Sequence, residues 1–286
     1  MSNYQKKGFL TEDYRLVHLR SDGGTRPEFH YHEFYKILLL VSGSGGYIVD
    51  GQRYALQSGD IVLIASHSVH RPEFEPGAAY ERIILYISPD FLRRASTPDC
   101  DLADCFRAAR GHVLRPQEPE RKKLFSLAAA LERELSADGY GKMLLCHGAV
   151  LRLLVHIGRS LHRSDASQPG SVTPGNERVS AIIRYLDRHL SEDIAIDALA
   201  ERFFLSKYHM MRLFRRETGT TIHGYLTERR LAQARELMAG GMSATDACFR
   251  SGFRSYCSFT RAYGKRFGST PTGRRDTAVL AEETYE

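Results

Sequence analysis

The chain has 286 residues, of which 42% are hydrophobic, and this length is sufficient for two domains with separate cores. The apolar run at residues 37–41 is far too short to span a bilayer, and the N-terminus lacks the hydrophobic stretch of a signal peptide. The cysteines are Cys100, Cys105, Cys146, Cys248 and Cys257. None of them is spaced as CxxC, which argues against a zinc finger or a disulfide scaffold. We therefore expect a cytoplasmic protein with no membrane association.

Net charge is distributed unevenly along the chain. Residues 178–275 contain 18 Lys and Arg against 9 Asp and Glu, which gives this segment a charge of +9. The whole chain carries +6, so the remaining residues together carry −3. A basic segment can neutralise phosphates and release counterions, so the charge favours nucleic acid as a partner of the C-terminal third.

Residues 1–87 have the pattern of a series of short strands. Residues 29–41 are rich in aromatic and branched side chains, and Asp50-Gly51 is a hairpin signal because both positions tolerate positive φ. Further strands are predicted at residues 61–64 and 80–87, with glycine turns and no helix between them. This arrangement predicts a sandwich or a small barrel.

From residue 89 to residue 163 the pattern becomes helical, with long helices predicted at residues 118–136 and 141–161. The second helix has a broad apolar face with two glycines that permit close helix approach, formed by Leu144, Leu145, Gly148, Leu151, Leu154, Val155 and Gly158. This face packs either within the monomer or against a second copy, and we favour dimerisation. Residues 164–175 are polar, with Pro and Gly, and predict a flexible linker.

Residues 176–276 are predicted to form an all-helical domain, followed by a frayed tail at residues 277–286. Near its end, Ser243 with Asp246 marks the start of a short helix, because an oxygen can accept an orphan N–H and a carboxylate suits the first turn. Gly252 supplies the left-handed residue that ends this helix, and Ser255 caps a second one. The segment is therefore a predicted helix-turn-helix.

On the second of these helices Phe259, Tyr263 and Phe267 recur every four residues and form one apolar face. The other face is polar and carries Arg261. A capped helix with an outward arginine suits a reader of the major groove, because the groove admits one helix and arginine can bond guanine O6 and N7 together.

The same pattern occurs twice. Helices are predicted at residues 178–190, 196–203, 207–218 and 222–239, and a shift of 49 residues aligns Ala198 with Ala247, Phe204 with Phe253, Ser206 with Ser255, Arg212 with Arg261, Phe214 with Tyr263, Arg216 with Lys265, Gly219 with Gly268 and Thr221 with Thr270. The cap, the turn aromatic and the outward arginine repeat in phase. Two such helices in one rigid unit can reach successive major grooves if they lie about 34 Å apart.

At residues 199–219 (LAERFFLSKYHMMRLFRRETG) and 247–275 (ACFRSGFRSYCSFTRAYGKRFGSTPTGRR) the sequence resembles the AraC/XylS family of bacterial transcription regulators. The resemblance implies a seven-helix domain that grips adjacent major grooves of double-stranded DNA. By position it implies that the reading helices carry Lys207, Tyr208, Met211, Arg212, Tyr256, Cys257, Ser258, Thr260 and Arg261. We expect Arg212 and Arg261 to contact bases, and we expect phosphate contacts from Arg215, Arg216, Lys265 and Arg266.

The N-terminal half resembles the cupin-like sensor domain often attached to such regulators. Gly24, His30-Tyr31-His32 and Gly43 match the first cupin motif, and residues 57–60 (QSGD) resemble the second without its proline. Lys36 stands where a cupin metal site normally has Glu, and Val62 stands where the second motif has His. The resemblance implies an α+β multidomain protein with a cupin-like β-barrel and helical dimerisation segment in residues 1–163, and two helix-turn-helix motifs in the all-α C-terminal domain.

Alternate residues of a strand share a face, so His30, His32 and Lys36 should point the same way. If that way is into the barrel, an ammonium near two imidazoles repels a cation and favours a ligand carboxylate or phosphate. Three interpretations remain open: an effector pocket without metal on His30, His32, Lys36 and His70, a metal site on His30, His32 and His70, or purely structural histidines.

These features favour a DNA-binding transcription regulator, an activator, controlled by an anionic or sugar-like small molecule. Its expected partners are DNA, the effector, a second copy and, for an activator, RNA polymerase. No cofactor is implied. One alternative is a constitutive DNA-binding protein with a silent sensor domain. The other is a metal-dependent cupin enzyme fused to a DNA-binding domain, which Lys36 and Val62 argue against because they replace two expected metal ligands.

Overall fold

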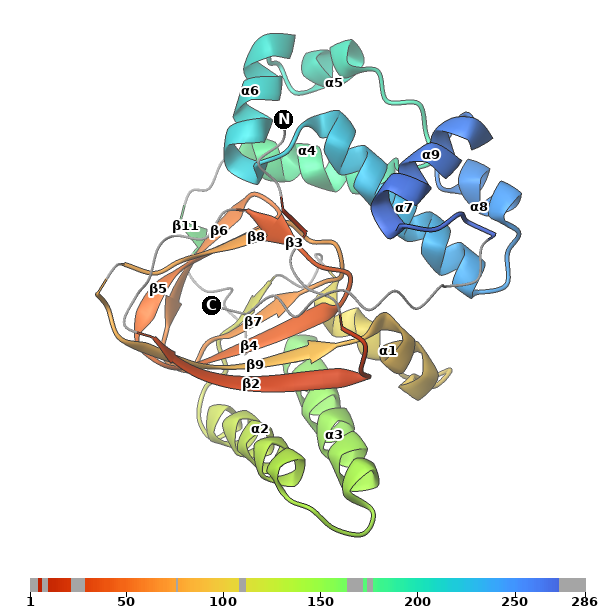
Figure 1. Cartoon of the computed structure of the whole chain (residues 1–286). Helices are drawn as coiled ribbons and strands as arrows, with labels where there is room; N and C mark the ends of the chain where they lie inside the picture. The colour runs from red at the N-terminus through yellow and green to blue at the C-terminus, as the bar shows by residue number, and fades with distance from the viewer. Residues whose placement is uncertain are drawn as a thin grey trace. The chain divides into compact units, whose positions relative to one another are not determined.

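The computed structural model describes residues 5–6, 10–21, 29–75, 77–107, 112–163, 172–173 and 177–272 (Figure 1). The chain divides into two compact units, one formed by Gln5–Gly175 and the other containing Asn176–Glu286. Gly24 and the predicted tail lie outside the described residues. So does the predicted linker, except for Val172–Thr173, which pair with the strand at Gln52–Gln57.

The first unit contains two sheets of short strands. The described strands of the six-stranded sheet follow the order β1-β3-β8-β5-β6-β11 and are β1 (Gln5–Lys6), β3 (His30–Tyr31), β8 (His70–Glu73), β5 (Ser44–Val49), β6 (Gln52–Gln57) and β11 (Val172–Thr173). Those of the five-stranded sheet follow the order β10-β7-β4-β9-β2 and are β10 (Val113–Leu114), β7 (Ile61–Ile64), β4 (Tyr35–Ser42), β9 (Tyr80–Ile87) and β2 (Tyr14–Ser21). This sheet-rich, cupin-like arrangement confirms the predicted fold class.

Strand β4 shows how one sequence serves two cores. Its even-numbered residues Leu38 and Leu40 pack into a cluster with side chains of both sheets, including Tyr47 and Tyr54. The odd-numbered residues of β4 belong to a second cluster formed with the helices. Because successive strand side chains point to opposite faces, β4 is apolar on both faces and is buried along most of its length.

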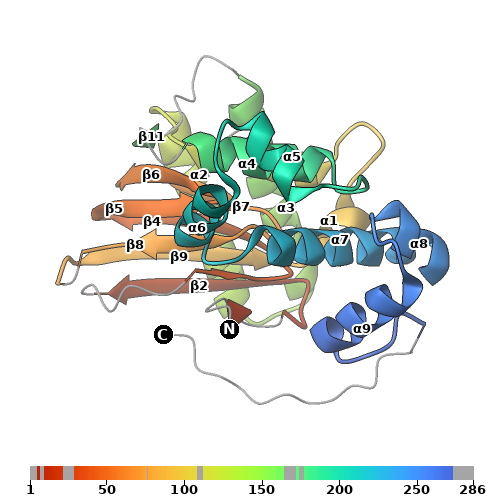
Figure 2. The same ribbon diagram turned by 90° about the horizontal axis from the view of Figure 1, so that it is seen from above.

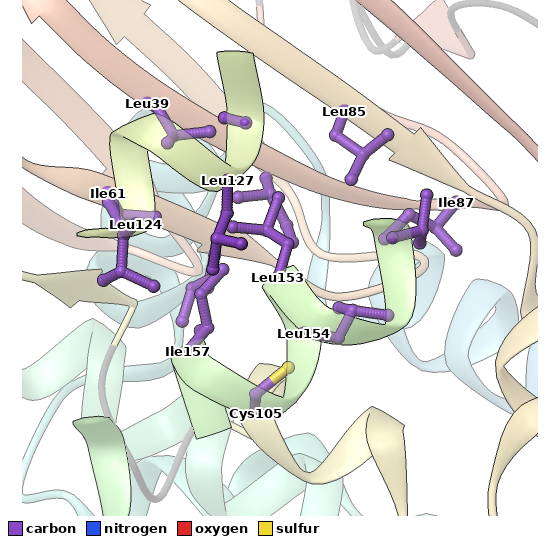
Figure 3. Packing of buried hydrophobic residues seen from close by; sticks show 14 of the residues in the cluster. Leu39, Ile61, Leu85, Ile87, Cys105, Leu124, Leu127, Leu153, Leu154 and Ile157 are labelled. Carbon is purple, nitrogen blue, oxygen red and sulfur yellow. The ribbon is translucent and has the colours of Figure 1, made fainter. Parts of the chain in front are cut away.

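Helices cover the outer face of the five-stranded sheet (Figure 1). They are α1 (Pro89–Ala95), the 3-10 helix η1 (Leu102–Phe106), α2 (Glu120–Ser136) and α3 (Lys142–His162). Leucines of α2 and α3 meet the aliphatic side chains of β4, β7 and β9, with Cys105 of η1 at the edge (Figure 3). By length and hydropathy α3 could cross a membrane, but its apolar face packs on this sheet.

The predicted apolar face of α3 is only partly correct. Leu154 is buried against the sheet, together with Cys146, Val150, Leu153 and Ile157, which the predicted face omitted. Leu144 is 76% exposed and Leu145 is 56% exposed. The helix therefore buries a face that is rotated from the predicted one and leaves part of the predicted face uncovered.

The strand predicted at residues 29–41 is not continuous. His30–Tyr31 belong to the six-stranded sheet as β3, residues 32–34 leave the strand, and β4 then enters the five-stranded sheet. The chain crosses between the sheets here, so β3 and β4 pair with different neighbours. The hairpin signal at Asp50-Gly51 is confirmed, because both residues have positive φ (46° and 77°) in the turn between β5 and β6.

A buried ion pair fixes the turn before β7. The carboxylate of Asp60 is fully buried and accepts hydrogen bonds from Arg115 Nε and Nη2, both at 2.7 Å, and from the Gln57 N–H at 2.8 Å. Arg115 Nη2 also donates a hydrogen bond to the Ala55 carbonyl at 3.1 Å. Asp60, a residue of the QSGD segment, is therefore a structural anchor between β6, β7 and the segment after β10.

The second unit is helical throughout its described part, residues 177–272, with six helices where the family resemblance implied seven. They are α4 (Glu177–Arg188), α5 (Ile196–Arg202), α6 (Lys207–Thr218), α7 (Ile222–Ala239), α8 (Ala244–Arg250) and α9 (Tyr256–Phe267). Side-chain caps begin α6 to α9, with the oxygens of Ser206, Thr221, Ser243 and Ser255 accepting from backbone N–H groups. Two helix-turn-helix motifs, α5-α6 and α8-α9, result.

The two motifs do not repeat at a constant spacing. Helices α6 and α9 begin 49 residues apart, as predicted, but α5 and α8 begin 48 apart, at Ile196 and Ala244. The second turn therefore contains one extra residue. The backbone hydrogen bonds show that Phe204 and Gly252 hold equivalent positions in the two motifs. Each is the left-handed residue of its turn, with φ of 53° and 95°. The predicted pairing of Phe204 with Phe253 is wrong for this reason.

Candidate functional sites

Helix α6 presents a basic and aromatic face. Ser206 Oγ accepts from the His209 N–H at 3.4 Å and starts the helix, while Met210, Leu213 and Phe214 anchor its inner face. All of its predicted DNA-contacting residues are exposed, and they are Lys207, Tyr208, Met211, Arg212, Arg215 and Arg216. Lys207 Nζ pairs with Asp197 at 3.0 Å. The outer face of α6 is thus basic and exposed to solvent.

Helix α9 presents a smaller polar face. Ser255 Oγ accepts from the Ser258 N–H at 3.4 Å, and Phe259 and Tyr263 are buried. Exposed predicted residues of this helix are Cys257, Ser258, Arg261 and Lys265. Two others are only half-exposed.

Those two residues are held by α9 itself. The ring of Tyr256 packs 5.9 Å from that of Phe259, measured between centroids, and the Thr260 hydroxyl donates to the Cys257 carbonyl at 3.1 Å. Both remain at the rim of the predicted reading face.

Arg266 corrects the predicted set of phosphate contacts. Its side chain is only 7% exposed, it pairs with Glu228 of α7, and its guanidinium lies 5.2 Å from the ring of Phe267. The Arg266 cation is therefore largely buried and paired, and the helix surface does not present it to a phosphate. The prediction for Arg266 is therefore wrong, and its role is to join α9 to α7.

Helix α7 connects the two helix-turn-helix motifs. Both α6 and α9 pack against it, and the views in Figures 1 and 2 place them toward its opposite ends. With 18 residues, α7 is about 27 Å long at the usual rise per residue. That length is of the same order as the pitch of DNA, about 34 Å.

The first unit brings the predicted histidines together in its interior. His30, His32, Lys36 and His70 are all buried, with the rings of His30 and His32 lying 4.3 and 4.8 Å from that of His70. Lys36 Nζ donates to the hydroxyl of Tyr47 at 3.0 Å. Sequence reasoning missed Tyr47, although its alternation within β5 would have placed it on the inner face.

Two of these imidazoles have a fixed proton position. His32 Nδ1 lies 2.6 Å from the Phe34 carbonyl, and His70 Nδ1 lies 2.9 Å from the Ser68 carbonyl. Because a carbonyl can only accept, each Nδ1 carries the proton, and each Nε2 presents a lone pair. Both Nε2 atoms are buried and make no hydrogen bond within the described part of the chain.

Burial lowers the pKa of His32 well below its usual value, and the positive charge of Lys36 lowers it further. Burial likewise lowers the pKa of His70, helped by His30 and His32. Both rings are neutral at physiological pH. The interior therefore offers two unprotonated nitrogen acceptors beside one ammonium group.

The described ranges contain no three His, Cys, Asp or Glu side chains arranged to hold a metal ion. Val62, at the position where the second cupin motif has His, lies in the apolar cluster between the sheets. The metal-site interpretation of His30, His32 and His70 has no support in this geometry.

Comparison with known proteins gives a consistent result for both units. The family described as "AraC-like ligand binding domain" matches residues 16–138, and the family described as "Helix-turn-helix domain" matches residues 199–277. The uncharacterized HTH-type transcriptional regulator YbfI of Bacillus subtilis is 26% identical over 225 residues, with 78% of each chain covered. The HTH-type transcriptional activator RhaS of Escherichia coli is 24% identical over 246 residues, with 86% of each chain covered.

Among solved structures, an apo form of ToxT from Vibrio cholerae aligns with 92% of this chain and 96% of its own. The identity is 12% and the TM-score 0.39.

Proposed function

The chain belongs to the AraC family of transcriptional regulators, with a ligand-binding N-terminal domain and a helix-turn-helix DNA-binding domain, and from this premise we propose how it recognises DNA. Helices α6 and α9 enter successive major grooves on one side of the duplex, with Arg212 and Arg261 contacting bases. The supporting observation is that two capped helices, joined through α7, both expose arginine on the face away from their core. Three further exposed cations of these helices, Arg215, Arg216 and Lys265, contact phosphates.

Removing a base-reading arginine should have a different effect from removing a phosphate contact. We expect Arg212→Ala and Arg261→Ala each to weaken binding of a selected operator by roughly 1–3 kcal/mol and to relax preference at one base position. Lys265→Ala should instead weaken binding to all sequences alike. It should also lower, by about one, the number of phosphate contacts inferred from the salt dependence of binding. Fluorescence anisotropy over a salt series measures both quantities, and unchanged operator affinity for the two arginine variants would exclude the assigned reading helices.

The N-terminal domain binds its effector at the buried histidines in this proposal. Two lone pairs on His32 Nε2 and His70 Nε2 call for a ligand that donates hydrogen bonds, and the ammonium of Lys36 excludes a cation. A ligand with hydroxyl groups, either a neutral polyol or a hydroxy acid, meets both requirements. Coupling to DNA requires that this ligand bind two states of the protein with different affinity.

We expect the full-length protein to bind a member of a panel of sugars and sugar acids in calorimetry. His32→Leu should abolish that binding, because it removes one acceptor, while leaving operator affinity without ligand unchanged. His189→Leu, a change in the second unit, serves as the matched control. A panel that gives no binding, or a His32→Leu variant that binds like wild type, would contradict the assigned pocket.

We also propose that α3 mediates homodimerisation. Leu144 and Leu145 are exposed, and side chains placed at Gly148 or Gly158 would meet no atom within 4 Å, so these glycines serve no close packing among the described residues. A surface hollow of about 400 Å³ lies beside Leu154, Val155 and Gly158. Helix α3 of a second copy could lie along this face.

Leu144→Glu should lower the association constant measured by sedimentation, because it places a charge in the contact. Tyr140→Glu, at a fully exposed site before α3, should leave association unchanged. A wild-type protein that sediments as a monomer at micromolar concentration, or two variants with the same association constant, would argue against this interface.

The remaining assignments follow from the regulator function. RhaS is named an activator, and we propose that this protein also activates transcription, with RNA polymerase as a partner, in the cytoplasm. We assign it no catalytic activity. A reporter gene behind the selected operator should therefore give more transcript when the effector is present, and unchanged or reduced transcript would contradict activation.

A further inference from the structure

Helix α6 and the turn before it expose apolar side chains at positions where α9 and its turn do not. Four large hydrophobic residues are exposed in the described part of the second unit, and three of them, Phe204, Tyr208 and Met211, lie on α6 or in the turn before it. Their exposed fractions are 94%, 85% and 42%. Tyr208, Met211 and Arg212 are neighbours on the helix surface, since residues three and four apart lie side by side.

The corresponding positions of the second motif are small or polar. Cys257 and Thr260 stand where α6 has Tyr208 and Met211, and Gly252 occupies the left-handed turn position of Phe204. The apolar side chains are therefore not required by the helix-turn-helix framework. They occur at these positions in the α5-α6 motif and not in the α8-α9 motif.

Phe204 is unusual in a second respect. Its φ of 53° lies in the left-handed region, which is unfavourable for a bulky residue and which glycine occupies in the other turn. At 94% exposure its ring gains little from burial in the free protein. A residue that is both strained and uncovered suggests a role in a complex.

The edges of the base pairs contain one apolar group in the major groove, the 5-methyl group of thymine. We propose that Phe204, Tyr208 and Met211 recognise thymine methyl groups in the half-site bound by α6, beside the base contacted by Arg212. This inference rests on the proposed binding of α6 to DNA. The α9 half-site is read through Arg261 and polar side chains and is insensitive to methyl groups.

The test uses deoxyuridine, which differs from thymidine only by the missing 5-methyl group. An operator is first selected with the full-length protein, and the α6 half-site is identified as the one where Arg212→Ala relaxes base preference. Replacing its contacted thymines by deoxyuridine should weaken binding about fourfold for each methyl group lost, while the same replacement in the α9 half-site should change affinity less than twofold.

A variant links the effect to the protein. Phe204→Gly suits the left-handed backbone, so the turn should remain folded, and this variant should lose part of the discrimination between thymine and uracil. Phe249→Ala, which removes a half-exposed ring from α8, should retain it.

Equal affinity for operators with thymine and with deoxyuridine in the α6 half-site would overturn the inference while leaving DNA recognition intact. So would a Phe204→Gly variant with unaltered discrimination, which would point to a protein partner for this ring. Failure to select any operator would overturn the proposed DNA recognition itself.

Discussion

Replacing Gly252 with alanine should unfold the second helix-turn-helix motif under conditions in which the N-terminal domain stays folded. Gly252 has a φ of 95°, and a Cβ there would lie 2.1 Å from the Leu190 carbonyl oxygen and 2.9 Å from Arg230 Nε. These atoms cannot easily move apart, because Arg230 Nε donates to that same carbonyl at 2.8 Å and Arg230 Nη2 donates to the Glu192 carbonyl. Strain and overpacking together should cost about 3 kcal/mol or more.

Gly241→Ala provides the matched control. Gly241 has a φ of 92°, yet a Cβ there would meet no atom within 4 Å. This variant should lose only the backbone contribution, about 1 kcal/mol. Calorimetry of the full chain, or hydrogen exchange of α8 and α9, measures the difference. Equal destabilisation by the two variants would show that the contact with Leu190 does not constrain the turn.

Removing Arg115 should destabilise the N-terminal domain by about 3–5 kcal/mol. The Asp60 carboxylate is fully buried and receives two hydrogen bonds from Arg115, so Arg115→Ala leaves an uncompensated charge in the interior. The double variant Asp60→Asn with Arg115→Met should recover part of the loss, because it removes the charge.

The surface pair Arg93–Asp90 gives the comparison for this prediction. Both side chains are about half exposed, so Arg93→Ala should cost less than about 1 kcal/mol. Urea denaturation of the full chain, followed through the unfolding transition of the N-terminal domain, distinguishes the Arg115→Ala and Arg93→Ala variants. If Arg115→Ala lowers the stability no more than Arg93→Ala, the buried pair does not anchor the turn.

Sequence patterns predicted most of the C-terminal domain because they act locally. Each N-cap oxygen accepts from an N–H three residues later, so Ser206, Ser243 and Ser255 could be recognised without tertiary information. The extra residue in the second turn could not be recognised, because a shift of 49 residues aligns α6 with α9 whether or not the turns match. That shift therefore aligns Phe204 with Phe253 instead of with Gly252.

The errors in the candidate sites have a tertiary origin. Arg266 lies in the basic last turn of α9, as phosphate ligands often do, and only the position of Glu228 on α7 shows that it is paired. Similarly, alternation along residues 29–41 correctly grouped His30, His32 and Lys36, although it could not reveal that the chain changes sheets between them. The free Nε2 of His32 depends on a carbonyl contact that no sequence pattern encodes.

The central claim, that α6 and α9 read successive major grooves, is tested most directly by guanine-methylation interference on a selected operator with the full-length protein. For each protein subunit we expect two blocks of interference on one face of the duplex, with centres about 10 base pairs apart. Arg212→Ala should relieve interference in one block and Arg261→Ala in the other. A single block, blocks on opposite faces, or variants that act on the same block would contradict the account.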